Sequence, residues 1–155
     1  MDIAAAAAAY EAGTRRFLEA ARSAPSDALD RRHPDGWSAR QVIHHVADSE
    51  AQSYARLRRL LAEPDPLIQG YDEAAWAAAP ALGYETLPVE HAIAVTAAVR
   101  EASLDLVRRL GPADLDRAGR HSEAGAYSVR TWLELYAAHP SDHAAQLERA
   151  LRGEA

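Results

Sequence analysis

Apolar residues recur at helical spacing in four long segments of the chain, and stretches rich in proline, glycine and polar residues separate them. A repeat of about 3.6 residues is typical of amphipathic helices that bury one face. The predicted helices cover residues 3–23, 38–61, 88–110 and 131–151. No segment has a convincing strand pattern, so the sequence predicts an all-α protein, a four-helix bundle that forms one domain over residues 1–155.

Local signals mark the ends of these helices. Ser38-Ala-Arg-Gln41 is a capping box that begins the second helix, and Trp37 before it can pack as a hydrophobic staple. Pro88 suits the first turn of the third helix. Ser128 can cap the last helix through its hydroxyl group.

The connection over residues 63–87 is long and is interrupted by prolines and glycines. Within it, residues 72–76 resemble a short helix with its own cap. A connection of this length can return the chain to the end where the second helix began, which would make the second and third helices parallel. The polar segment before the last helix is expected to form a loop or a small hairpin around residues 121–127.

The last helix carries the strongest chemical signal, a pair of histidines on its apolar face. Its inward stripe consists of Trp132, Tyr136, His139, His143, Leu147 and Ala150. Side chains four residues apart have Cβ atoms about 5–6 Å apart, so the imidazoles of His139 and His143 can converge on one ion. Buried histidines often bond only a carbonyl or a water, so a metal site needs a third ligand from elsewhere. Pro140 predicts a kink between the two histidines.

His44 and His45 in the second helix are candidates for the third ligand. They lie on opposite flanks of the apolar face, so periodicity does not decide which one turns inward. If the second and last helices are antiparallel, His45 and His143 lie about 10 and 14 Å from the same end, given 1.5 Å per residue. Asp48 follows one turn after His45 and could orient an imidazole or simply lie on the helix surface.

Composition narrows the chemistry further. The chain has 155 residues, a formal net charge of -6, and neither cysteine nor lysine. It therefore has no thiolate ligand, no thiol nucleophile of its own and no Schiff-base lysine. The negative charge argues against a nucleic-acid partner. No apolar run approaches the roughly 20 residues that span a bilayer, and the alanine run at 4–9 lacks a basic flank, so we expect a cytoplasmic protein without a membrane partner.

Four motifs occur in a characteristic order: GWSARQVIHHVADSE at 36–50, YDEAAWA at 71–77, HSEAG at 121–125 and LYAAHPSDHAAQL at 135–147. Together they resemble the DinB-like superfamily, and more narrowly its YfiT-type branch of metal-dependent hydrolases and bacillithiol S-transferases. The resemblance implies an up-down-down-up four-helix bundle, often dimeric, with a divalent metal held by His45, His139 and His143. Zinc is the expected ion, with nickel or manganese as alternatives, and a homodimer is the expected assembly.

The resemblance also implies a function, the transfer of a small-molecule thiol to an electrophilic small molecule. The alternatives are a metal-dependent hydrolase at the same site, or a metal-free bundle that acts as a binding or dimerisation module. Arg40, Arg56 and Arg130 are candidate clamps for carboxylates of the thiol. Gln146 stands where relatives often carry another histidine, so a hydrogen bond near the site is expected to differ.

Overall fold

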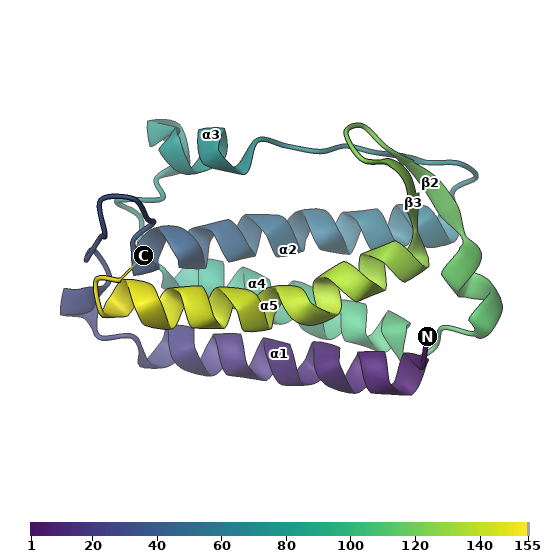
Figure 1. Cartoon of the computed structure of the whole chain (residues 1–155), viewed down its shortest axis with the longest axis horizontal. Helices are drawn as coiled ribbons and strands as arrows, with labels where there is room; N and C mark the ends of the chain where they lie inside the picture. The colour runs from purple at the N-terminus through teal and green to yellow at the C-terminus, as the bar shows by residue number, and fades with distance from the viewer. Residues whose placement is uncertain (155) are drawn as a thin grey trace.

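Four long helices pack side by side in the structure, a computed structural model that describes residues 1–154 (Figure 1). Each helix buries one apolar face against its neighbours, as the periodicity predicts. Their bounds are α1 Ile3–Ser23, α2 Ala39–Ala62, α4 Glu90–Val107 and α5 Val129–Leu151.

The connectivity places α2 and α4 parallel to each other and antiparallel to α1 and α5 (Figure 1). α1 packs on α4 and α5, and α2 packs on the same two helices from the other side. This up-down-down-up arrangement confirms the predicted fold. Among the described residues, no helix is both long enough and apolar enough to cross a membrane.

Side-chain caps fix the beginnings of three of the long helices. Asp2 accepts hydrogen bonds from two backbone N–H groups of the first turn of α1. Ser38 and Gln41 form the predicted capping box at α2, with each side chain bonded to the other residue's backbone N–H. Ser128 accepts from the N–H of Thr131 at the start of α5. These caps satisfy donors that a helix would otherwise leave without partners.

The long connection crosses the top of the bundle in Figure 1 and carries the expected short helix, α3 (Glu73–Ala78). Asp72 caps α3 by accepting from the N–H of Ala75. The crossover returns the chain to the end where α2 begins, which is why α2 and α4 are parallel. Short 3₁₀ turns occur at Ser26–Ala28, Pro80–Leu82 and Pro112–Asp116.

A small three-stranded sheet beside the bundle corrects the prediction that the chain has no strand. Its strands are β1 Leu67–Ile68, β2 Ala118–His121 and β3 Gly125–Ser128. β1 pairs in parallel with β2, and β2 and β3 form the antiparallel hairpin expected near residues 121–127. A Cβ at Gly119 would collide with the carbonyl oxygen of Pro66, so the close approach of β1 and β2 requires glycine there. Strands of two to four residues are too short to show alternation in the sequence.

The core consists of two apolar clusters with a polar layer between them. One cluster includes Phe17 and Ile43, and the other includes Leu57 and Trp132. Between them the helices bury polar side chains: Ser49, Glu50, Ser53, Thr96, Arg100 and Ser103. Buried polar groups are costly unless they are paired, so this layer is where the fold departs from simple hydrophobic packing.

Candidate metal centre

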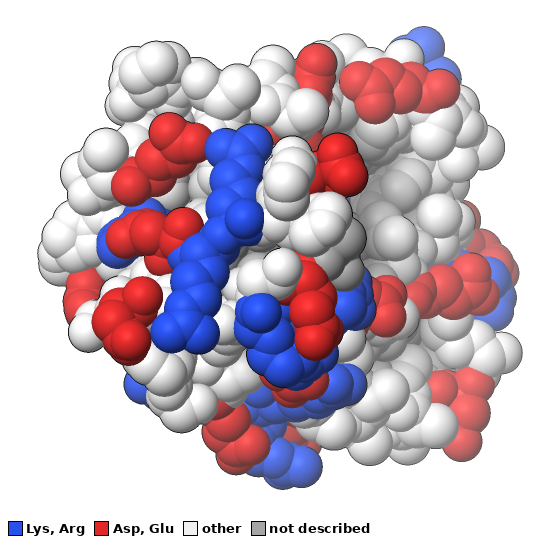
Figure 2. Space-filling view, turned by 60° about the vertical axis from the view of Figure 1, so that its left-hand side comes forward, with Lys and Arg blue, Asp and Glu red and all other residues white. Residues whose placement is uncertain are grey.

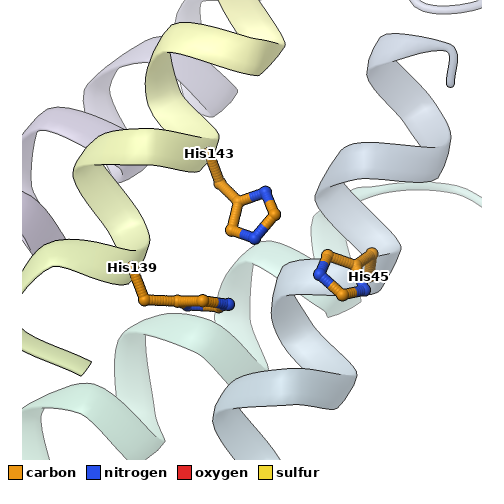
Figure 3. A group of neighbouring side chains, drawn as sticks. All are labelled: His45, His139 and His143. Carbon is orange, nitrogen blue, oxygen red and sulfur yellow. The ribbon is translucent and has the colours of Figure 1, made fainter. Parts of the chain in front are cut away.

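Three histidines converge between α2 and α5. Figure 3 shows His139 and His143, one turn apart on α5, pointing toward His45 on α2. The ring centroids lie 4.7 Å apart for His45 and His143, 4.4 Å for His139 and His143, and 6.2 Å for His45 and His139. The structure therefore brings together the three side chains that the sequence singled out.

One ring nitrogen from each histidine lies within 4.8 Å of one from each of the others. Imidazole nitrogens bonded tetrahedrally to one zinc ion at 2.0–2.1 Å are about 3.4 Å apart. The rings therefore need to close by up to about 1.4 Å, a movement that small side-chain rotations can supply. The arrangement fits an ion of this size without rearrangement of the helices.

Two of the three rings are oriented by hydrogen bonds at Nδ1. His139 Nδ1–H donates to Glu50 Oε1 at 2.9 Å, and His143 Nδ1–H donates to the side-chain oxygen of Gln146 at 2.7 Å. With the proton at Nδ1, the Nε2 lone pair of each neutral ring faces away from these partners, which is the tautomer that binds a metal through Nε2. The Ser49 hydroxyl lies 3.3 Å from His139 Nε2 and donates to it when no ion is bound.

Asp48 does not orient an imidazole. Its carboxylate accepts a 2.6 Å hydrogen bond from the Tyr84 hydroxyl, so the residue that orients His139 is Glu50. Gln146 fills the position where a histidine was expected in relatives, and its amide oxygen orients His143 instead.

Glu50 is fully buried, and Arg100 balances its charge. Arg100 Nη1 donates to both carboxylate oxygens at 3.2 Å and to the Tyr136 carbonyl oxygen at 2.9 Å. Pro140 explains the last bond, because it lacks the N–H group that would otherwise bond to the Tyr136 carbonyl within the helix. α5 changes direction part-way along its length, as the proline predicts (Figure 1). The kink that separates the two histidines is thus stabilised by the same guanidinium that holds Glu50.

His45 is buried, and its Nδ1 atom has no hydrogen-bond partner among residues 1–154. Burial, together with the neighbouring rings of His143 and His139, lowers the pKa of His45 to about 3. Burial and His139 likewise lower the pKa of His143 to about 4. Both imidazoles are therefore neutral at pH 7, the protonation state that metal ligation requires.

These pKa shifts predict that the metal-free protein loses stability as the pH falls below about 6.5. Below this pH, His45 and His143 bind protons in the unfolded chain but stay neutral in the folded protein. The free energy of unfolding therefore falls by up to about 1.4 kcal/mol per pH unit for each of these two histidines. The loss continues toward their folded pKa values of about 3 and about 4. Urea unfolding at several pH values measures the slope, and His143→Gln should reduce it by roughly half. An unchanged slope in this variant would show that the pKa of His143 is not lowered in the folded protein.

The side of the cluster that faces the crossover is polar and partly open. Glu73, in the first turn of α3, places a carboxylate oxygen 3.9 Å from His45 Nε2 and is half-exposed. The Tyr71 hydroxyl is buried near Ser49 without a hydrogen bond of good geometry, and burial raises its pKa. A substrate that entered from this side would meet a carboxylate and a phenol as well as the imidazoles.

The three candidate anion-binding arginines have different surroundings. Arg40 pairs with Asp30 at 2.6 Å, and Arg130 pairs with Asp116 at 3.2 Å. Arg56 is buried and makes no ion pair with any carboxylate in the described part of the chain. Its guanidinium donates instead to the Tyr136 hydroxyl at 3.0 Å and to the Gln69 carbonyl oxygen at 2.8 Å.

Charged side chains of both signs are interspersed on the end of the bundle where α1 ends and α2 begins (Figure 2). Two of the arginines near this end pair with acids, Arg31 with Asp27 and Arg152 with Glu154. His44, the other candidate from α2, lies outside the cluster, and its Nε2 atom is 3.2 Å from the Leu87 carbonyl oxygen.

A family model described as the DinB superfamily matches residues 9–147. The chain belongs to the DinB superfamily. A protein of Oceanobacillus iheyensis, named as a candidate metal-dependent hydrolase, is 38% identical over 112 residues, which cover 72% of this chain and 63% of that protein. A second protein of that organism with the same kind of name is 32% identical over 142 residues, or 91% of this chain and 80% of the relative. The chain thus spans less than two thirds of the first relative's length.

A solved structure has the same fold. YfiT from Bacillus subtilis is described as a probable metal-dependent hydrolase with an unusual four-helix bundle topology. It matches with a TM-score of 0.85 at 27% identity, over 97% of this chain and 86% of its own. Together with these relatives, the three-histidine cluster supports a divalent metal ion as cofactor.

Sequence reasoning missed four residues of the site: Glu50, Arg100, Tyr71 and Glu73. For two of them a signal was present. Arg100 lies seven residues after Ile93 and seven before Val107, which are both apolar residues buried in the core. Glu50 likewise lies seven residues after the buried Ile43 and seven before the buried Leu57. A polar residue at the i+7 position between two core residues is expected to face the core. Tyr71 and Glu73 lie in the crossover, where no period applies.

Proposed function

We propose that this chain holds one divalent metal ion with His45, His139 and His143 and transfers a low-molecular-weight thiol to an electrophilic small molecule. Zinc is the proposed ion, ahead of nickel or manganese. The observation that carries the proposal is the convergence of three imidazoles without a protein carboxylate among the proposed ligands. Structural zinc sites normally have four protein ligands, whereas three ligands leave a position for a reactant.

The transfer uses a thiol that arrives as a cosubstrate, because the chain has no cysteine. A divalent ion bound at the site would stabilise the thiolate form of that thiol. Glu73 is placed to accept the thiol proton and, being half-exposed, to release it to solvent. The thiol sulfur forms a bond to the electrophilic carbon, and the bond to the leaving group breaks with its electron pair. The Tyr71 hydroxyl can donate a hydrogen bond to the departing group.

The surroundings of Arg56 favour a thiol cosubstrate that carries a carboxylate group. Of the three candidate arginines, Arg56 alone has no acidic partner in the described structure. Its guanidinium donates a hydrogen bond to the Tyr136 hydroxyl, which lies at the edge of the site. The Tyr136 ring lies 5.3 Å from that of His139. A carboxylate of the cosubstrate would balance the buried guanidinium charge, which otherwise lacks a counterion.

Hydrolysis at the same site is the second candidate, and the names of the relatives favour it. Dinitrochlorobenzene with and without cysteine as the thiol separates the two reactions, because transfer gives a thioether and hydrolysis gives dinitrophenol. We expect the thioether above the uncatalysed rate only with both metal and thiol present. Dinitrophenol formed without thiol would show a hydrolase instead.

Metal binding itself predicts a change in stability. At a metal concentration 100 times the dissociation constant, the native state gains about 2.7 kcal/mol, which for a chain of this size raises the melting temperature by roughly 5–10 °C. Thermal unfolding of protein without a histidine tag, before and after a chelator, measures this shift. Equal melting temperatures, with no metal in the purified protein, would indicate a binding or dimerisation module without a metal.

A further inference from the structure

A cavity of about 360 Å³ lies beside the metal centre, beneath α3 and the turn that follows it. Its lining is mostly apolar and includes Trp37, Gln41, Ala74, Ala78 and the charged pair Arg32 and Glu85. Sites of roughly 300–1,000 Å³ with such walls and a few polar groups are typical of small-molecule binding. The residues of the metal centre do not themselves line it, so it is a separate space.

Two contacts connect this cavity to the histidine cluster. The Trp37 indole lines the cavity and also packs on the His45 ring, with the centroids 4.9 Å apart. Ala74 lines the cavity and directly follows Glu73, whose carboxylate is 3.9 Å from His45 Nε2. One end of the cavity therefore abuts the open side of the metal centre.

The charges at the cavity wall neutralise each other. Arg32 Nη1 is 3.4 Å from Glu85 Oε1, and the Gln41 amide nitrogen donates to the same oxygen at 3.3 Å. The wall thus offers no net charge to an occupant. A charged ligand would lose hydration on entering without gaining an opposite charge, whereas an uncharged apolar ligand gains from leaving water.

We propose that this cavity binds the acceptor, an uncharged and largely apolar small molecule, with its electrophilic carbon at the His45 end. A cavity of about 150 Å³ holds one benzene molecule, so this volume accommodates up to about two aromatic rings. The identification of the occupant as the acceptor rests on the proposed function. The class of molecule that the cavity binds does not, since it follows from the shape and charge of the walls.

Binding can be tested in metal-free protein without any thiol. Dinitrotoluene serves as an unreactive probe, and the indole N–H signals of the tryptophans report its position by NMR. We expect the Trp37 signal to shift on titration. The Trp132 signal should stay in place, because its indole N–H donates to the Ser53 carbonyl oxygen in the core. A shift at Trp132 alone, or no shift at either residue, would overturn the proposal.

Variants in α3 make the test specific. Ala78 and Ala74 both line the cavity and are exposed, so Ala78→Leu and Ala74→Leu add volume there without disturbing the core. Each should weaken probe binding at least tenfold. Ala75→Leu is the matched control, because Ala75 is exposed on the same helix but does not line the cavity, and it should bind as the original chain does. Equal effects of all three variants would contradict the assignment, as would tight binding of dinitrobenzoate, a charged probe of similar size.

Kinetics then connect the cavity to catalysis. In metal-loaded protein, Ala78→Leu should raise the KM of dinitrochlorobenzene at least tenfold and leave the KM of cysteine unchanged. If the probe binds at Trp37 but no transfer occurs, the cavity proposal stands and the proposed function fails. If transfer occurs with an unchanged acceptor KM in both cavity variants, the proposed function stands and the cavity proposal fails.

Discussion

Replacing Arg100 with methionine is expected to lower the free energy of unfolding by about 3–5 kcal/mol, because the buried carboxylate of Glu50 is left without its counterion. Arg100 also donates to Thr14 Oγ1 at 2.8 Å and to the Tyr10 carbonyl oxygen at 2.9 Å, and its Cζ atom lies 3.3 Å from the centroid of the Tyr10 ring. One side chain of α4 thus bonds to residues of the other three long helices. Urea unfolding of metal-free protein at pH 7 measures the loss.

Arg108→Met is the matched control for this substitution. Arg108 lies on the surface and pairs with Glu11 at 2.8 Å. Its replacement should therefore lower the free energy of unfolding by less than about 1 kcal/mol. A double variant, Arg100→Met with Glu50→Gln, removes both buried charges and should recover part of the stability. Similar losses in Arg100→Met and Arg108→Met would show that the buried pair does not hold the polar layer together.

The second large effect is expected at the metal site itself. His45→Ala removes the one histidine that α2 contributes to the cluster. If the proposed ligand set is right, this variant should weaken divalent metal binding by more than 100-fold, a loss beyond the 10–100-fold typical of residues that only support a ligand. His44→Ala is the neighbouring control, since His44 lies outside the cluster. Equilibrium dialysis with zinc, on protein without a histidine tag, compares the two variants.

The outcome of this comparison discriminates between the candidate ligands. Retained affinity in His45→Ala would mean that His139 and His143 bind the ion with some other group. Lost affinity in His44→Ala would mean that the cluster seen in the structure, which contains His45, includes the wrong histidine of the pair. Circular dichroism of both variants shows whether any loss reflects unfolding instead.

Much of the fold follows from the sequence because the local signals agree with one another. The capping box at Ser38 and Gln41, the cap at Ser128 and the apolar stripes of four helices all indicate the same elements. The long crossover fixes the order of the helices in space. Agreement of propensity, capping and pattern is what allows a sequence to specify one structure.

The parts that could not be predicted depend on contacts between distant segments. The β1–β2 pairing joins Leu67 and Arg120, and no local pattern in either two- to four-residue strand indicates its partner. The choice of His45 over His44 came from family resemblance, since both lie on the flanks of the stripe. Arg100 donates both to the Glu50 carboxylate in α2 and to the Tyr136 carbonyl oxygen in α5, which Pro140 leaves without a partner in its own helix. Only the packing of the helices brings these groups together.

X-ray absorption spectroscopy of the zinc-loaded protein, prepared without a histidine tag, is the most direct test that three rings share one ion. Three imidazole ligands with Zn–N distances of about 2.0–2.1 Å are expected, with the remaining position occupied by a light atom from solvent. His45→Ala should reduce the imidazole count by one. A spectrum of the original chain with fewer than three imidazoles, or one dominated by carboxylate oxygen, would contradict the proposed centre.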